Sequence, residues 1–141
     1  MIRFRKVVFV DTSAFIGLIA NSDRFHDAAV EIMTELTRNE SRLITSESVL
    51  FELANGFSRT RFRDSAVEFI RQIASNSDVK VIWSSRELFD MAVDLYKDRP
   101  DKEWSLTDCA SFVVMKDHQI DLAFTSDKHF EQAGFKKLLE N

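Results

Sequence analysis

The feature of this sequence that most constrains its fold is a regular alternation of two patterns. Short runs rich in Val, Ile, Leu and Phe are typical of buried strands, and longer segments with apolar residues at helical spacing are typical of helices. The expected strands are residues 6–10, 42–46, 79–83 and 122–126, with a further candidate at 135–139. The expected helices are residues 26–38, 47–61, 64–75, 85–98 and 106–118. This alternation predicts an α/β fold with a central, mostly parallel sheet covered by helices on both faces.

The length and composition indicate one domain. The chain has 141 residues, which suffices for a sizeable core, and no repeat or linker divides it, so we expect a single domain over residues 1–141. Its single cysteine excludes an internal disulfide and is typical of a cytoplasmic protein. Residues 1–20 imitate a signal peptide, but Asp11 interrupts the apolar run, which is also too short for a membrane helix. We therefore expect a strand and then a helix there, and no membrane contact.

Asp11 is unusual because it stands between two apolar runs, residues 7–10 and 14–19. An ionised carboxylate in apolar surroundings is costly unless a donor, a cation or water pairs with it. Asp11 directly follows the first expected strand, and parallel sheets bind ligands at the carboxyl ends of their strands. Asp127 has the equivalent position after residues 122–126. Each of these aspartates, taken alone, is explained equally well as a cap of the following helix.

Two further acidic residues lie on expected helices. Glu52 shares a stripe with Ser48, Asn55 and Arg59, which is either a solvent-exposed face or one wall of a polar cleft. Asp108 begins a helix that is apolar around most of its circumference and is therefore expected to be buried. Residues 105–108 also have the form of a capping box, so capping and catalysis are both compatible with Asp108.

These carboxylates could all converge at one edge of a parallel sheet, where their mutual repulsion would favour a bound cation. Oxygen ligands without clustered His or Cys select Mg²⁺ or Mn²⁺ over zinc. The three histidines have no spacing typical of metal ligands, so we expect core or surface roles for His26, His118 and His129. The sequence therefore predicts a magnesium or manganese site built from four acidic residues, which are Asp11, Glu52, Asp108 and Asp127.

The charge of the chain limits how it can bind nucleic acid. Its formal net charge is -4, so it lacks a general positive field, and phosphate contacts must be local or assisted by metal. The local candidates are basic residues near two of the acidic ones, namely Arg59, Arg61, Arg63 and Lys128. The arginines are expected to continue the Glu52 helix, where a solvated helix end explains them equally well.

In four motifs the sequence resembles the PIN-domain ribonucleases, in particular the toxins of VapC-type toxin–antitoxin modules. The motifs span nearly the whole chain and are VFVDTSAFIGL (8–18), TSESVLFEL (45–53), WSLTDCASFVVM (104–115) and AFTSDKHFEQAGF (123–135). The resemblance implies a three-layer α/β/α sandwich and a metal-dependent endoribonuclease that hydrolyses RNA. It further implies frequent homodimers and inhibition by a small antitoxin.

The resemblance also assigns residues. All four acidic positions of the family pattern are present, so Asp11, Glu52, Asp108 and Asp127 are the implied catalytic and metal-binding residues. A hydroxyl near the first aspartate commonly supports such a site, and Ser13 or Thr12 fits this role. Asn55, as a neighbour of Glu52, is a further supporting candidate.

Three other interpretations use the same acidic residues. A phosphatase of the haloacid dehalogenase type needs a second aspartate two positions after Asp11, where Ser13 stands. A phosphoacceptor receiver domain needs an aspartate at the end of a central strand, where residues 79–85 offer serines. The alternative that stays open is a PIN-like protein- or RNA-binding module without catalytic activity.

Overall fold

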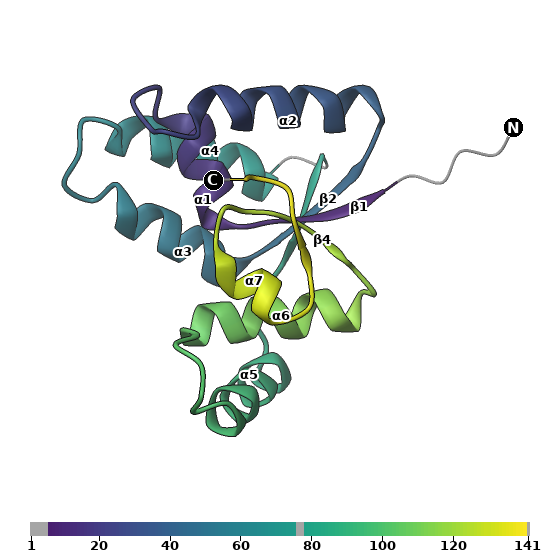
Figure 1. Ribbon diagram of the computed structural model, residues 1–141. Helices are drawn as coiled ribbons and strands as arrows, with labels where there is room; N and C mark the ends of the chain where they lie inside the picture. The colour runs from purple at the N-terminus through teal and green to yellow at the C-terminus, as the bar shows by residue number, and fades with distance from the viewer. Residues whose placement is uncertain (1–5, 76–77, 141) are drawn as a thin grey trace, which may run out of the picture.

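The computed structural model describes residues 6–75 and 78–140, which form one sheet with helices on both of its faces (Figure 1). The strands are β1 (Val7–Val10), β2 (Arg42–Ser46), β3 (Val79–Ile82), β4 (Leu122–Phe124) and β5 (Lys136–Lys137). The helices are α1 (Thr12–Ile19), α2 (His26–Arg38), α3 (Glu47–Gly56), α4 (Arg63–Ser75), α5 (Arg86–Asp98), α6 (Leu106–Asp117) and α7 (Lys128–Gln132). Residues 1–5 of the N-terminal segment discussed above lie outside the described residues.

The sheet confirms the predicted parallel arrangement. Its strand order is β3-β2-β1-β4-β5, and every neighbouring pair is parallel. The first strand is therefore central, with β2 on one side and β4 on the other. Because the strands run in the same direction, the residues that follow β1, β2 and β4 all emerge at one edge of the sheet.

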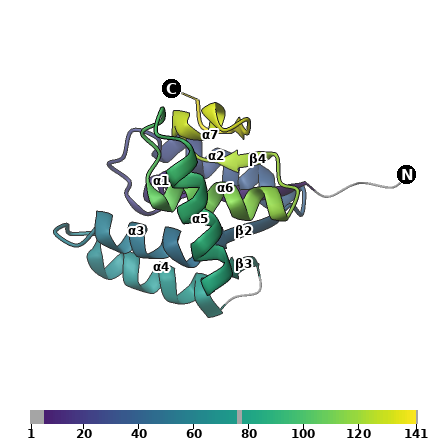
Figure 2. The same cartoon turned by 90° about the horizontal axis from the view of Figure 1, so that it is seen from below.

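Helices form a layer on each side of this sheet. Figure 1 shows α2 on one side of the central strands and α5 and α6 on the other, and the view in Figure 2 places α5 and α6 in front of the strands. This arrangement confirms the expected α/β/α sandwich. None of the described helices combines the length and the apolar character that crossing a membrane requires.

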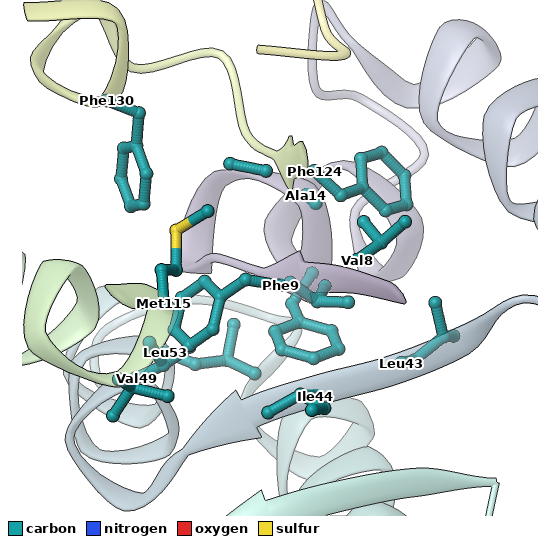
Figure 3. Close-up of a cluster of buried hydrophobic side chains, with 14 of the residues drawn as sticks. Val8, Phe9, Ala14, Leu43, Ile44, Val49, Leu53, Met115, Phe124 and Phe130 are labelled. Carbon is teal, nitrogen blue, oxygen red and sulfur yellow. The ribbon is translucent and has the colours of Figure 1, made fainter. Parts of the chain in front are cut away.

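The hydrophobic core lies between the layers, where the strands contribute side chains to both faces. Figure 3 shows part of it, with labelled side chains from β1, β2, β4, α1, α3, α6 and α7. Phe9 is fully buried, and its ring stacks on Phe130 with 6.4 Å between ring centroids. Phe112 of α6 makes edge contacts at 5.0 Å with both Phe130 and Trp104. Burial of one such side chain contributes roughly 1.5–3 kcal/mol, so these contacts hold α6 and α7 firmly beside β1.

One helix boundary differs from the prediction, with consequences for the basic residues. The third helix ends at Gly56, and not at residue 61, because the chain turns so that Phe57 enters the core. Phe62 packs edge-on against Phe57 at 5.9 Å and closes the turn. The prediction that the arginines continue the Glu52 helix is therefore wrong. Arg59 and Arg61 lie in the α3–α4 connection, and Arg63 begins α4.

Candidate metal centre

All four predicted acidic residues lie near the carboxyl edge of the sheet. Two of them follow strands, and the other two lie within the first two turns of helices. Asp11 directly follows β1 and is the N-cap residue of α1, and its backbone N–H donates to the carbonyl of Phe124 in β4 at 3.1 Å. Asp127 is the N-cap residue of α7, shortly after β4. Asp108 lies in the first turn of α6, and Glu52 lies on α3, the helix that follows β2.

A network of hydroxyl groups joins the ends of β1 and β4. Thr125 donates from Oγ1 to Asp11 Oδ2 at 2.8 Å, and the same Oγ1 accepts the backbone N–H of Asp127 at 3.1 Å. Ser13 Oγ lies 3.0 Å from Thr125 Oγ1 and accepts the backbone N–H of Ser126 at 3.0 Å. Ser13, a predicted supporting residue, thus contacts the Asp11 network through Thr125.

The carboxyl group of Asp11 lies in an unusually acidic and dry environment. Burial, as the largest cause, raises its pKa from 3.8 to about 7. Hydrogen bonds from the Thr125 side chain and the Thr12 backbone oppose this rise, whereas the negative charges of Glu52 and Asp108 add to it. Within the described part of the chain, no lysine or arginine forms an ion pair with Asp11 or Glu52. The carboxyl groups of Asp11 and Glu52 are therefore not paired with a lysine or an arginine of the described residues.

Asp108 performs the capping role that the sequence suggested and still reaches the site. Its Oδ2 accepts the backbone N–H of Ser105 at 3.1 Å, and its own N–H donates to Ser105 Oγ at 3.0 Å, which forms a complete capping box. The same Oδ2 lies 2.9 Å from Nδ1 of His129. Capping and participation in the acidic site are therefore compatible in this fold.

A second group of possible ligands overlaps with the predicted four. Each of Asp108, Asp127 and His129 offers one ligand atom, and these atoms lie within 4.8 Å of one another. Asp127 accepts the backbone N–H of His129 on Oδ1 at 2.9 Å, which begins α7. His129 is the residue that sequence reasoning missed here, because it was expected in a core or surface role. Its position two residues after Asp127, on the same helix start, was the available signal.

The remaining supporting candidates occupy different places. Thr12 is buried, and its Oγ1 forms no hydrogen bond with any described residue. Asn55 is exposed and lines a groove of about 310 Å³ together with Glu52, Phe51 and Thr107. A larger hollow of about 700 Å³ contains none of the four acidic residues, since it lies along β3 and the start of β2. We therefore consider the smaller groove beside Glu52 the relevant one.

The predicted basic residues lie at the surface. Arg61 stacks on the ring of Phe62 at 4.8 Å, and Arg63 donates to the carbonyl of Ser58 at 2.7 Å. Arg59 is exposed in the same connection, and Lys128 is exposed at the first position of α7, next to Asp127. Their contact with phosphate groups stays a prediction.

The chemistry of this donor set fits a divalent cation. Four carboxyl groups supply oxygen atoms, which Mg²⁺ and Mn²⁺ prefer, and the buried Asp11 has no basic partner among the described residues. Oδ1 of Asp108 and Oδ2 of Asp127 accept no hydrogen bond from the described residues, so both have lone pairs for a ligand. Of the four, Asp108 and Asp127 belong to the group of ligand atoms that lie within 4.8 Å of one another, and a metal ion shared by Asp11, Glu52, Asp108 and Asp127 stays a prediction.

Comparison with known proteins identifies the family and the fold. The family model for the PIN domain matches residues 8–136. No curated protein matches the sequence. Among solved structures, the VapC20 toxin of Mycobacterium tuberculosis, described as cleaving the sarcin-ricin loop, superposes with a TM-score of 0.82. It is 27% identical, and the match covers 91% of this chain and 95% of VapC20.

Two more distant structures share the fold. VapBC2 from Rickettsia felis, described as bound to a DNA fragment from its promoter, has a TM-score of 0.67 at 15% identity, with 93% of this chain and 96% of the other covered. FitAcB from Neisseria gonorrhoeae has a TM-score of 0.64 at 12% identity, with 92% and 95% covered. At these identities the likeness concerns the fold alone.

Proposed function

The chain belongs to the PIN-domain family, and from that premise we propose that it is a Mg²⁺- or Mn²⁺-dependent endoribonuclease. It hydrolyses phosphodiester bonds in RNA as the toxin component of a toxin–antitoxin pair, and residues 1–141 act as a single domain. The observation that carries this proposal is the buried carboxyl group of Asp11, which faces the charges of Glu52 and Asp108 without a basic partner among the described residues. A purely structural site gains nothing from such repulsion.

The four acidic residues have different roles in this proposal. Asp11 and Asp108 would hold the cation most directly, and Glu52 and Asp127 would complete its surroundings partly through water. Such a cation lowers the pKa of a bound water and offsets the charge of the phosphate. One of the four carboxylates accepts the proton of the attacking water, and Ser13 and Thr125 keep Asp11 and the α7 start in place.

RNA is the proposed substrate class because the motifs resemble those of PIN-domain ribonucleases, and because VapC20, with 27% identity over most of the chain, is described as a toxin that cleaves the sarcin-ricin loop. The surface residues Arg59, Arg61, Arg63 and Lys128 would contact phosphates on either side of the cleaved bond. Asn55 lies in the groove beside Glu52, where an RNA strand would approach this carboxylate.

We propose two protein partners, a small antitoxin and a second copy of this chain, acting in the cytoplasm. Chains of the same fold occur in the VapBC2 and FitAcB structures, which supports the antitoxin. Three phenylalanines lie on α3, on α4 and in the connection between them, namely Phe51, Phe69 and Phe57. Of these, Phe57 is buried and Phe69 packs against Phe15 at 5.7 Å. Phe51 is 65% exposed and is the member of this group that remains available. Analytical ultracentrifugation of the wild type and of Phe51→Ser tests the dimer.

A catalytically silent binding module is the second candidate function, and one observation favours it. Asp108 and Asp127 both perform capping roles, so their presence has a structural explanation that needs no metal. This explanation does not extend to Asp11, whose side chain forms no capping hydrogen bond, or to Glu52.

Two measurements distinguish the candidates. Isothermal titration with Mn²⁺ should show saturable binding to the wild type, and an RNA pool should be cleaved in Mg²⁺ but not in excess chelator. Asp11→Asn should remain folded and lose both properties. A wild-type protein that does not bind Mn²⁺, or that cleaves equally well in chelator, would contradict the proposed function and favour the module.

A further inference from the structure

The imidazole ring of His129 lies between two of the proposed metal ligands. Its Nδ1 is 2.9 Å from Asp108 Oδ2 and 3.4 Å from Asp127 Oδ1. Its backbone N–H donates to the same Oδ1 of Asp127 at 2.9 Å. The side chain is only 19% exposed, so water does not weaken these contacts as it would at the surface.

The surroundings of Nδ1 determine where its proton is. Both neighbouring atoms are carboxylate oxygens, which accept hydrogen bonds, and Asp108 Oδ2 already accepts one from the backbone of Ser105. Nδ1 therefore carries a hydrogen and donates it to Asp108. Nδ1, protonated in this way, has no lone pair for a metal ion, whereas Nε2 keeps its own.

Two hydrogen-bond donors contact the same carboxylate oxygen of Asp108 and leave the other oxygen without a donor among the described residues. Ser105 and His129 both contact Oδ2, and no described residue donates to Oδ1. A carboxylate held by two donors of different direction cannot rotate freely. The hydrogen bond of His129 also reduces the repulsion between Asp108 and Asp127 when no cation is present.

We propose that His129 is a positioning residue of the metal centre, whose Nδ1–H orients Asp108 so that Oδ1 of that carboxylate binds the cation. This inference rests on the proposed function, because it requires Asp108 to be a metal ligand. His129 does not coordinate the metal through Nδ1. Residues that orient metal ligands by hydrogen bonds typically contribute 10- to 100-fold to metal affinity.

Two substitutions at one position test this role. His129→Phe keeps an aromatic ring but has no donor, and it should weaken Mn²⁺ binding roughly 10- to 100-fold in isothermal titration. His129→Asn keeps a side-chain N–H that reaches the position of Nδ1, and it should bind Mn²⁺ within about threefold of the wild type. The matched control is His118→Phe, since His118 is exposed at the end of α6 and bonds to the carbonyl of Val114. Its affinity for Mn²⁺ should be unchanged.

Magnetic resonance provides a measurement that does not depend on activity. Long-range ¹H–¹⁵N spectra should show the His129 Nδ1 proton in the metal-free protein and its retention after Mg²⁺ is added. Loss of that proton, with the ¹⁵N shift of a coordinated nitrogen, would show that His129 is a ligand and would overturn the inference. Thermal melting in chelator identifies any variant that is unfolded.

The outcomes of these experiments distinguish a failure of this inference from a failure of the proposed function. If the wild type binds no Mn²⁺, both fail. If the wild type binds and folded His129→Phe binds equally well, only the positioning role fails. If His129→Asn binds as weakly as folded His129→Phe, the donor is not what matters and the positioning role also fails. Weak binding by His129→Phe with recovery in His129→Asn supports it.

Discussion

Asp11 is the residue whose surroundings most affect the chemistry of the site. Its carboxyl group is buried at the end of β1, beside the charges of Glu52 and Asp108, and these conditions raise its pKa to about 7. The unfolded chain has the ordinary value of 3.8. Between these two values the folded chain binds more protons than the unfolded chain, so stability falls as the pH rises and levels off above about pH 7.

Asp11→Asn removes the free-energy cost of ionising this buried carboxyl group. The substitution should therefore stabilise the metal-free protein at pH 8. The rise of the pKa from 3.8 to about 7 corresponds to an upper limit of about 4 kcal/mol. Urea denaturation in chelator at pH 5 and pH 8 measures the effect, which should be larger at pH 8. A variant that is less stable than the wild type at pH 8 would contradict the assignment of the raised pKa.

Thr125 is a second residue whose substitution should affect both the stability of the fold and the binding of metal. Thr125→Val removes the hydroxyl that donates to Asp11 and accepts from Asp127, which should cost about 1–3 kcal/mol of stability. It should also raise the pKa of Asp11 further and weaken Mn²⁺ binding at pH 7, because the metal must displace a proton. Thr125→Ser keeps the hydroxyl and should bind Mn²⁺ almost as the wild type does. Equal binding by Val and Ser variants would exclude a role for this hydrogen bond.

At the scale of the element, the first turn of α6 combines a helix cap with a metal ligand. The capping box of Ser105 and Asp108 begins the helix, and the apolar circumference of α6 is buried beneath the sheet, so this turn has little freedom to move. A rigid element therefore presents Asp108, while the short helix α7 presents Asp127 and His129.

Two N-cap serines allow a matched test of whether the cap of α6 affects metal binding. Ser105→Ala and Ser85→Ala each remove an N-cap hydroxyl, from α6 and α5 respectively, and each should cost about 1 kcal/mol of stability. Only Ser105→Ala should weaken Mn²⁺ binding, because Ser85 caps a helix that carries none of the proposed ligands. Denaturation and titration of both variants check this. The same loss of Mn²⁺ affinity in both would mean that the effect is a general loss of stability.

At the scale of the whole molecule, the cation and the fold should stabilise each other. Mn²⁺ at 100 times its dissociation constant adds about 2.7 kcal/mol to the free energy of unfolding. Binding requires deprotonated Asp11, so the dissociation constant should increase about tenfold for each pH unit below 7. Thermal melting from pH 5.5 to 8 should thus show stability nearly independent of pH in saturating Mn²⁺, and falling with pH up to about pH 7 in chelator. Parallel curves in both conditions would contradict a metal centre at Asp11.

Several elements were predictable because their signals are local. Residues 42–46 and 26–38 form a strand and a helix with the expected bounds, since their side-chain periodicity is present in a few consecutive residues. The end of α3 was not predictable in this way. Its polar stripe continues past Gly56, and only the burial of Phe57 against Phe62 ends the helix there.

The sequence by itself determined which strands and helices form and that Asp11 and Asp127 follow strands, because these properties depend on neighbouring residues. Only the tertiary structure decided that Thr125 donates to Asp11 across 114 positions and that His129 contacts Asp108 across 21. Such contacts depend on β4 pairing with β1 and on α6 packing beside α7. Hydrogen bonds require distances near 3 Å, and no local pattern specifies the distance between segments so far apart in the chain.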